Sequence, residues 1–124
     1  GQMQFRRYPL QPTSTGPISS VQGWSRANLA EDLSVEKLAQ RAAMSPRNFT
    51  RVFTRETGAP PARFVAEARL AAAREKLEQS RDTLDRIAAE TGFGSSINLR
   101  RSFERQLHLT PGEYRQRFHC RKMA

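Results

Sequence analysis

At 124 residues the chain has room for one compact domain or two very small ones. No stretch reaches the roughly 20 consecutive apolar residues that cross a bilayer. We therefore expect a cytoplasmic protein. Lys+Arg 21 against Asp+Glu 12 gives a formal net charge of +9, nearly all of it from arginine, and this favours nucleic acid as a partner over a merely soluble basic surface. The single cysteine, Cys120, excludes an internal disulfide, and with the histidines His108 and His119 it predicts neither a metal site nor another cofactor.

The hydrophobic periodicity predicts an all-α chain of about seven helices, with no alternating strand pattern. Residues 1–17 carry several prolines without sustained periodicity, which is typical of a linker or arm. A weak helical stripe then runs from Ile18 to about Leu29. Clearer helices follow, each opened by a capping residue or a proline, at 34–41, 45–57, 60–79, 82–90, 95–107 and 110–118.

One pattern of the size of a helix-turn-helix motif occurs twice. An apolar-Ala pair at 38–39 recurs at 87–88, 49 residues later, and Phe/Leu-x-Arg-x-Phe-x-Arg at 49–55 recurs at 99–105, 50 residues later. The second copy therefore has one extra residue in its turn, which contains Gly92-Phe93-Gly94. We expect four segments: a linker at 1–17, a first helix-turn-helix unit at 18–60, a spacer helix at 61–79, and a second unit with a C-terminal tail at 80–124.

The second helix of each copy is expected to bury one face and to expose a face rich in arginine. In the first copy, Phe49, Val52 and Phe53 share the apolar side. A helix fits the major groove of B-DNA, where arginine pairs with guanine, asparagine with adenine, and an apolar side chain with the thymine methyl. The candidate base-reading residues are Arg47, Asn48, Thr50 and Arg51 in the first copy and Ile97, Asn98, Arg100 and Arg101 in the second.

A further set of residues is expected to contact DNA phosphates, because helix starts present N–H groups and hydroxyls, and arginine adds positive charge. For Arg55 and Arg105 the alternative is an ion pair with a nearby acid such as Glu56 or Glu104. Glu104 would be repelled by phosphate and is expected to mark the edge of the contact zone. The candidates are Ser34, Ser45, Arg55, Arg63, Ser95, Arg105 and Thr110.

The length of the spacer helix suits two grooves. About 17 residues at about 1.5 Å per residue give ~26 Å of rod, and successive major grooves on one face of DNA lie ~34 Å apart. A monomer is therefore expected to seat both arginine-bearing helices in adjacent turns of a duplex. Because the two exposed faces differ in composition, the expected target is two unlike half-sites about one turn apart.

These motifs resemble the C-terminal DNA-binding domain of AraC/XylS-type transcriptional regulators over roughly residues 18–118. The likeness also rests on Arg69-Leu70-x-x-Ala73 and Thr110-Pro111-x-x-Tyr114-Arg115. It implies two helix-turn-helix units, recognition helices at about 45–57 and 95–107, and sequence-specific binding of double-stranded DNA. The resemblance also adds Ser96 to the candidate base-reading residues of the second copy. It further implies regulation of bacterial transcription, with activation through contact with RNA polymerase, and no enzymatic activity.

The turn at 92–95 and the Gln2-Met3-Gln4-Phe5 opening are most similar to a branch in which an amidotransferase-like sensor domain precedes the DNA-binding domain. Residues 1–17 would then be the interdomain linker, and a small-molecule effector would act only through the sensor domain. Two positions depart from the family pattern. Pro60 stands where a capping Ser or Thr is common, and His108 replaces a glycine, which predicts a less sharply formed end of the sixth helix.

Two other functions stay open on the sequence. An architectural or RNA-binding helical protein would use the same positive charge without reading bases. An enzyme would use Cys120 as a nucleophile or, as in the alkylation-repair regulators that carry domains of this family, as a methyl acceptor. No convincing catalytic base accompanies Cys120 in the sequence, which disfavours the enzyme.

Overall fold

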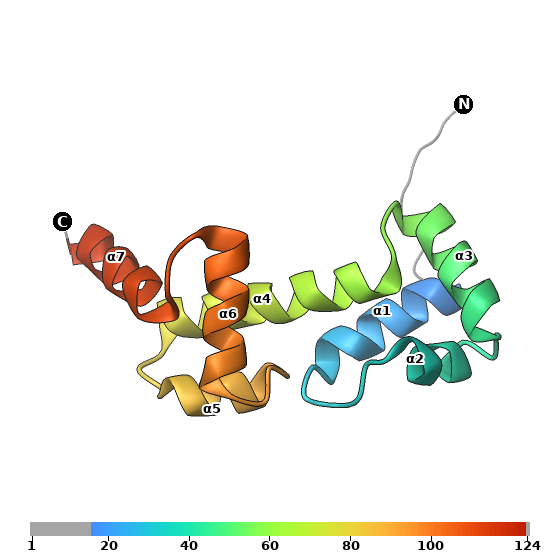
Figure 1. Ribbon diagram of the computed structural model, residues 1–124, viewed down its shortest axis with the longest axis horizontal. Helices are drawn as coiled ribbons and strands as arrows, with labels where there is room; N and C mark the ends of the chain where they lie inside the picture. Colours follow the sequence, from blue (N-terminus) through green and yellow to red (C-terminus); the bar gives the residue numbers. More distant parts are fainter. Residues whose placement is uncertain (1–15, 124) are drawn as a thin grey trace. The chain divides into compact units, whose positions relative to one another are not determined.

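The computed structural model describes residues 16–123, with side chains described as far as His119. These residues form seven helices and no strand (Figure 1), so the all-α prediction is confirmed. The linker predicted at 1–17 lies almost entirely outside the described residues. The helices are α1 (Pro17–Ala27), α2 (Val35–Arg41), α3 (Pro46–Thr57), α4 (Pro61–Gln79), α5 (Leu84–Glu90), α6 (Ser96–Leu107) and α7 (Pro111–Met123).

Hydroxyl side chains set where α2, α3, α5 and α6 begin. Each hydroxyl oxygen accepts a hydrogen bond from the backbone N–H three residues later, at 3.1–3.3 Å, which satisfies a helix donor that would otherwise lack a partner. The capping residues are Ser34, Ser45, Thr83 and Ser95. The residue before α4, Pro60, has no side-chain acceptor, and its carbonyl accepts the ordinary first helical bond from the N–H of Phe64 at 3.2 Å.

The end of α6 is sharply formed, so the expectation drawn from the missing glycine was wrong. His108 adopts the left-handed conformation, with φ 62° and ψ 27°, and its N–H donates to the carbonyl of Glu104 at 3.1 Å. Gly58 ends α3 in the same way, with φ 87° and ψ 0°. His108 therefore takes the position of a terminating glycine and accepts the strain that a side chain brings to this conformation.

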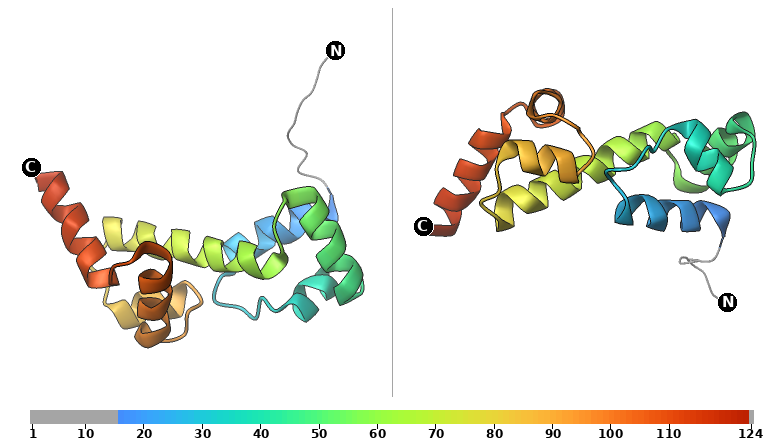
Figure 2. Two further views of the ribbon diagram at one scale, coloured as in Figure 1. Left: turned by 45° about the horizontal axis from the view of Figure 1, so that its top comes forward. Right: turned by 90° about the horizontal axis from the view of Figure 1, so that it is seen from below.

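The described residues pack into two compact units (Figure 2). Unit 1 comprises the residues up to Asn28 together with Leu33–Phe64, and therefore contains α1, α2, α3 and the first turn of α4. Unit 2 comprises Leu29–Asp32 and the residues from Val65 onward, including the rest of α4 and α5–α7. The segment Leu29–Asp32 thus connects two helices of unit 1 along the chain but belongs to unit 2.

The core of unit 1 forms around α3. Phe49 and Phe53 are fully buried with ring centroids 5.6 Å apart, and the ring of Phe64 lies 5.6 Å from that of Phe53. Ile18 of α1 and Leu38 of α2 are also fully buried, and both of these helices contact α3. Each such side chain contributes about 1.5–3 kcal/mol when buried, which strongly favours this rotation of α3 about its axis.

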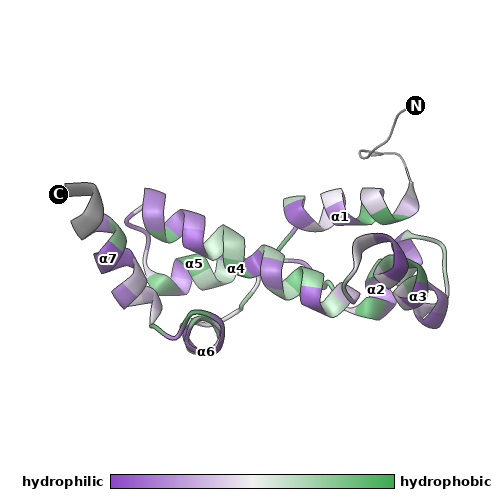
Figure 3. Ribbon diagram, turned by 90° about the horizontal axis from the view of Figure 1, so that it is seen from above, coloured by the Kyte–Doolittle hydropathy of each residue, from purple (hydrophilic) through white to green (hydrophobic). Residues whose placement is uncertain are grey.

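The core of unit 2 joins α4, α5 and α6, and Figure 3 shows hydrophobic residues alternating with hydrophilic ones along α4. Its fully buried residues are Ala73, Leu77, Ile87, Ala88, Leu99 and Phe103. Tyr114 of α7 packs against this cluster, with its ring centroid 5.7 Å from that of Phe103 in an edge-on arrangement. α7 is therefore attached to the same core as the second helix-turn-helix motif.

The duplication in sequence is also a duplication in packing. The ring pair of Phe103 and Tyr114 lies 50 positions after the ring pair of Phe53 and Phe64, and the two centroid distances agree within 0.1 Å. In both units the second ring comes from the helix that follows the motif. Each helix-turn-helix motif is thus closed by an aromatic contact with the next helix.

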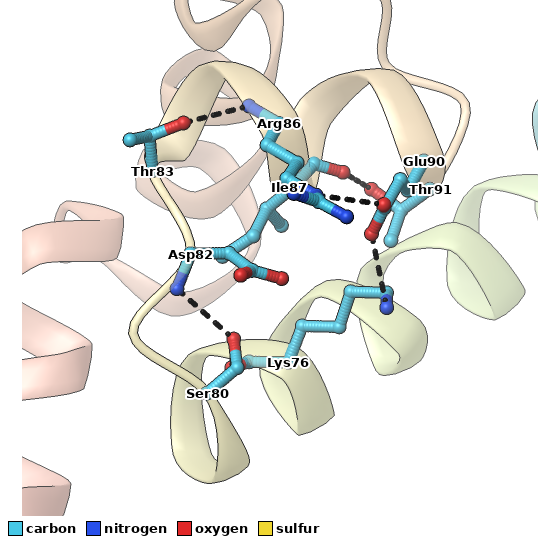
Figure 4. Close-up of polar contacts among 8 residues, drawn as sticks. All are labelled: Lys76, Ser80, Asp82, Thr83, Arg86, Ile87, Glu90 and Thr91. Atoms are coloured by element: carbon cyan, nitrogen blue, oxygen red, sulfur yellow. Dashed lines mark hydrogen bonds and ion pairs between the residues drawn. The ribbon is translucent and has the colours of Figure 1, made fainter.

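A network of polar side chains connects α4 to α5 within unit 2 (Figure 4). The Glu90 carboxylate pairs with Lys76 Nζ at 3.1 Å and accepts from Arg86 Nε at 3.0 Å, and these bonds, that of Lys76 first, hold the pKa of Glu90 below its ordinary value. Between the helices, the N–H of Asp82 donates to Ser80 Oγ at 3.3 Å. Exposed ion pairs add little stability, so the buried core holds this corner together.

Ser25 offers a test of the core of unit 1. Among the described residues, its Oγ is a buried side-chain oxygen without a hydrogen-bond partner, which costs about 1–3 kcal/mol. Ser25→Ala should therefore leave the free energy of unfolding unchanged or raise it by up to about 1 kcal/mol in denaturant titrations. The control is Thr91→Val, expected to lose about 1 kcal/mol, because Thr91 Oγ1 donates to Ile87 O at 2.6 Å. Clear destabilisation by Ser25→Ala would contradict this description.

His108→Gly tests the left-handed end of α6. Glycine adopts a positive φ without the penalty of about 1–2 kcal/mol that a side chain carries there, although it also gains freedom in the unfolded chain. We expect thermal unfolding to show a stabilisation of about 0.5–1 kcal/mol. The same substitution at Gln106, inside α6, should instead destabilise by about 1 kcal/mol. Loss of stability at both positions would show that His108 is not strained.

Candidate nucleic-acid interface

α3 exposes the face that the sequence predicts. Its buried residues are Phe49, Val52 and Phe53. Arg47, Arg51 and Arg55 are exposed, and Thr50 is half-buried at the edge of the core. Because 3.6 residues make one helical turn, burial of the aromatic side leaves the arginines on the solvent side.

Asn48 holds one of these arginines in place. The Oδ1 atom of Asn48 accepts a hydrogen bond from Arg51 Nη2 at 2.6 Å, and the backbone N–H of Asn48 donates to the capping Ser45 Oγ at 3.2 Å. The guanidinium of Arg51 is therefore tied to the first turn of α3. A charge-assisted bond of this kind lowers the entropy that a long side chain loses when it binds.

α6 exposes a face of different chemistry. Its buried residues are Leu99, Ser102 and Phe103. Asn98, Arg100 and Arg101 are exposed and Ser96 is half-buried. Ile97 is 62% exposed, which makes it the exposed large hydrophobic side chain of the described residues. An exposed isoleucine beside arginines is suited to contact with an apolar group such as a thymine methyl.

Asn98 stands at the same step of α6 as Asn48 in α3 but makes a different contact. Its Nδ2 donates to the carbonyl of Phe93 in the preceding turn, at 3.1 Å. This turn has one more residue than the first, and it contains two glycines with positive φ, Gly92 at 91° and Gly94 at 86°. The amide of Asn98 keeps a second hydrogen and an oxygen with which to meet a base.

The acid on α6 pairs with Arg100. Glu104 Oε2 lies 3.5 Å from Arg100 Nε, one helical turn earlier, whereas the sequence suggested Arg105 as its partner. Both side chains are largely exposed. An exposed pair of this spacing is worth about 0.3–0.5 kcal/mol, so Arg100 can exchange it for a phosphate or a base at little cost.

The candidate phosphate contacts fall into two kinds. The side chains of Arg55, Arg63 and Arg105 are exposed. The hydroxyls of Ser34, Ser45 and Ser95 accept hydrogen bonds as helix caps. Because a hydroxyl that accepts can also donate, the capping role is compatible with a bond to a phosphate oxygen.

Thr110 is less open to phosphate than the other caps. Its backbone N–H donates to Glu113 Oε1 at 2.8 Å, and its Oγ1 accepts from the N–H of Glu113 at 3.1 Å, so the two residues form a capping box. The bond from the Thr110 backbone keeps the pKa of Glu113 below its ordinary value. A carboxylate therefore already occupies the donor that a phosphate would use.

A hollow of about 460 Å³ lies in unit 2 where the starts of α5, α6 and α7 come together. It is lined by Leu84, Ser96, Ile97, Arg100, Thr110, Pro111 and Gly112. The sequence predicts the exposed residues of α6 here but gives no sign of Leu84 as their neighbour. The hollow is made by three helix starts that are distant along the chain, so no local pattern reveals it.

Other kinds of site find little support in the described part of the chain. Within it, no group of three His, Cys, Asp or Glu side chains is placed to hold a metal ion. None of the helices described is long and apolar enough to cross a bilayer. The side chain of Cys120, the candidate nucleophile, lies outside the described side chains.

The chain is similar to known proteins along most of its length. A family model described as a helix-turn-helix domain matches residues 38–117. The HTH-type transcriptional regulator Rv1931c of Mycobacterium tuberculosis is 51% identical over 84 residues, which cover 68% of this chain and 32% of that protein. The multiple antibiotic resistance protein MarA of Escherichia coli is 30% identical over 98 residues, which cover 79% of this chain and 77% of that protein. This chain therefore spans about a third of the length of the Mycobacterium protein.

Solved structures share the fold. The DNA-binding domain of AdpA, a global transcriptional factor crystallised in complex with a target DNA, matches with a TM-score of 0.82 at 37% identity, covering 86% of this chain and 96% of that chain. The C-terminal domain of AraT, a response regulator from Geobacillus stearothermophilus, matches with a TM-score of 0.79 at 19% identity, covering 85% of this chain and 88% of that chain. At that identity the second likeness concerns the fold alone.

Asn48→Ala tests the bond that holds Arg51. Without its acceptor the guanidinium samples more orientations, and we expect about a three- to tenfold weaker preference at one base position, with little change in the free energy of unfolding. Competition between duplexes that differ at single base pairs measures this. Asn98→Ala is the comparison, expected to affect only bases read by α6. Equal loss at every position from Asn48→Ala would contradict the assigned role.

Proposed function

Because the chain belongs to the AraC-type family of helix-turn-helix transcriptional regulators, we propose that it binds double-stranded DNA sequence-specifically with α3 and α6 in adjacent major grooves. The observation that carries the proposal is the duplicated exposed face. In both units a fully buried apolar side forces the arginine-bearing side of the second motif helix into solvent. Two such faces on one chain suit a duplex, which repeats its major groove once per turn.

Three arginines are proposed to read guanine. Arg47, Arg51 and Arg101 are exposed on the two helices, and a guanidinium can donate to guanine O6 and N7 together. Each such pair discriminates against a wrong base by about 1–3 kcal/mol. Asn98 is proposed to read adenine and Ile97 to contact a thymine methyl. Arg55, Arg63 and Arg105, with the capping serines, are proposed to contact phosphates.

In the proposed complex, the length of α4 suits the distance between adjacent major grooves. This helix has 19 residues, or about 28 Å at 1.5 Å per residue, and adjacent major grooves lie about 34 Å apart. One chain would then contact two half-sites without a second copy. The DNA complex of the AdpA domain supports duplex DNA as the partner of this fold.

The role in the cell is part of the same proposal. The protein acts on bacterial promoters as an activator, through contact with RNA polymerase, and works in the cytoplasm on nucleoid DNA. Any small-molecule effector acts through a sensor domain outside this chain. The proposal draws on relatives that are named as transcriptional regulators and activators, such as the transcriptional activator RhaS of Pectobacterium carotovorum.

Binding measurements with a selected operator test specificity. We expect the selected duplex to bind about 10³-fold or more tightly than random duplex at moderate salt. Structured RNA and single strands should compete no better than random duplex. Equal affinity for selected and random duplex would instead support an architectural protein.

Substitution of single arginines tests the assignment of roles. Arg51→Ala and Arg101→Ala should each relax preference at one base position, at a cost of about 1–3 kcal/mol. Arg55→Ala should weaken binding to all sequences alike and lower the slope of log affinity against log salt by about 1. An equal loss of affinity for all sequences from Arg51→Ala would instead assign Arg51 to the residues that contact phosphates.

A further inference from the structure

We propose that Arg69 of α4 is a positioning residue for α6: it holds the segment Leu29–Asp32 against the turn at Gly92 and so fixes the direction in which α6 presents its base-reading residues. The inference rests on the proposed function and deepens it. All of its contacts lie within unit 2. Arg69 is half-buried and has no part in the contacts with DNA proposed above.

Arg69 binds two backbone carbonyls that are distant along the chain. Its Nε donates to Leu29 O at 3.1 Å, and its Nη2 donates to Glu31 O at 3.0 Å. Burial lowers the pKa of the Arg69 guanidinium, and the negative charge of Asp32 opposes that shift. The planar fork of an arginine can serve two carbonyls at once, whereas the single ammonium of a lysine cannot match that geometry.

The turn of the second motif lies directly against the contact between Arg69 and Leu29. Gly92 has a φ of 91°, and a Cβ placed on it would lie 2.0 Å from Leu29 O and 2.3 Å from Arg69 Nε. Contacts that short do not occur, so position 92 requires glycine for two reasons: the backbone conformation and the space. Leu29 O is therefore held between a donor on α4 and the backbone of the turn.

From the turn, backbone and side-chain bonds continue into α6. The N–H groups of Phe93 and Gly94 both donate to Ala88 O at the end of α5, at 2.9 and 3.1 Å. Asn98 Nδ2 donates to Phe93 O at 3.1 Å. The turn is thus hydrogen-bonded to α5 and to the first turn of α6, and at Gly92 it lies against the contact between Arg69 and Leu29.

The first motif shows what the second has added. Its turn is one residue shorter, and the residue with positive φ is Ala43, at 57°, whose side chain is exposed. A methyl group is tolerated there because it points to solvent. In the second motif the equivalent position is Gly92, and the absence of a side chain there allows the backbone at Leu29 to approach. Arg69 therefore acts on α6 and not on α3.

Base preference tests the proposal. Arg69→Met keeps the length and apolar stem of the side chain but removes its donors. We expect about tenfold weaker binding to the operator, with base preference relaxed in the half-site read by α6, preserved in the half-site read by α3, and an unchanged salt slope. The operator affinity and base preference of Arg69→Lys should lie between those of Arg69→Met and wild type. Arg81→Met, a loss of an exposed charge beside α5, is the matched control and should change base preference nowhere.

Amide hydrogen exchange without DNA separates this proposal from the proposed function. Exchange at residues 92–98 should become several-fold faster in Arg69→Met and stay unchanged in Arg81→Met. If wild type shows no sequence preference while this exchange difference is present, the proposed function fails and the role of Arg69 in holding the turn stands. Unchanged exchange at 92–98, or equal relaxation of both half-sites, would overturn the proposal. If Arg69→Met does not fold, Arg69→Lys gives the same two readouts.

Discussion

The burial of one apolar face on α3 and one on α6 determines which side chains these two helices expose to solvent. Phe49 and Phe53 in α3, and Leu99 and Phe103 in α6, are completely buried. A helix that anchors residues four apart on one side has no freedom to rotate about its axis, so Arg51 and Arg101 must face solvent. Because the core fixes the rotation of the two helices, each helix exposes its arginines on one face.

On this shared framework the two motifs have diverged at their turns. Asn48 and Asn98 occupy the same helical step, yet Asn48 holds Arg51 while Asn98 holds the carbonyl of Phe93. The cause is the extra residue of the second turn, which places that carbonyl within reach of α6. The glycine at position 92 lets the backbone of this turn lie against Leu29, where a Cβ would be 2.0 Å from the Leu29 carbonyl oxygen. The two turns therefore give α3 and α6 different surroundings, although both helices bury residues at the same positions.

Local chemistry explains which features the sequence predicts. Ser45-Pro46 and Thr110-Pro111 indicate where two helices start, and the apolar periodicity indicates which helix face is buried. Both signals depend on residues that are close together along the chain. The contact of Arg69 with Leu29 joins residues 40 positions apart, and the hollow beside Leu84 depends on three helix starts, so neither leaves a local signal. The expectation for the end of α6 was wrong because His108 adopts the left-handed conformation that a terminating glycine would take, and its N–H still bonds to Glu104 O.

The central claim is that one chain reads two unlike half-sites in a fixed order and at a fixed distance. Selection from a pool of random duplexes, followed by insertion of about half a helical turn between the selected elements, tests it most directly. We expect two different elements with centres about 10 base pairs apart, always in one orientation, and a loss of at least tenfold in affinity on insertion. A palindrome, a single short element, or affinity that is indifferent to the insertion would contradict the account.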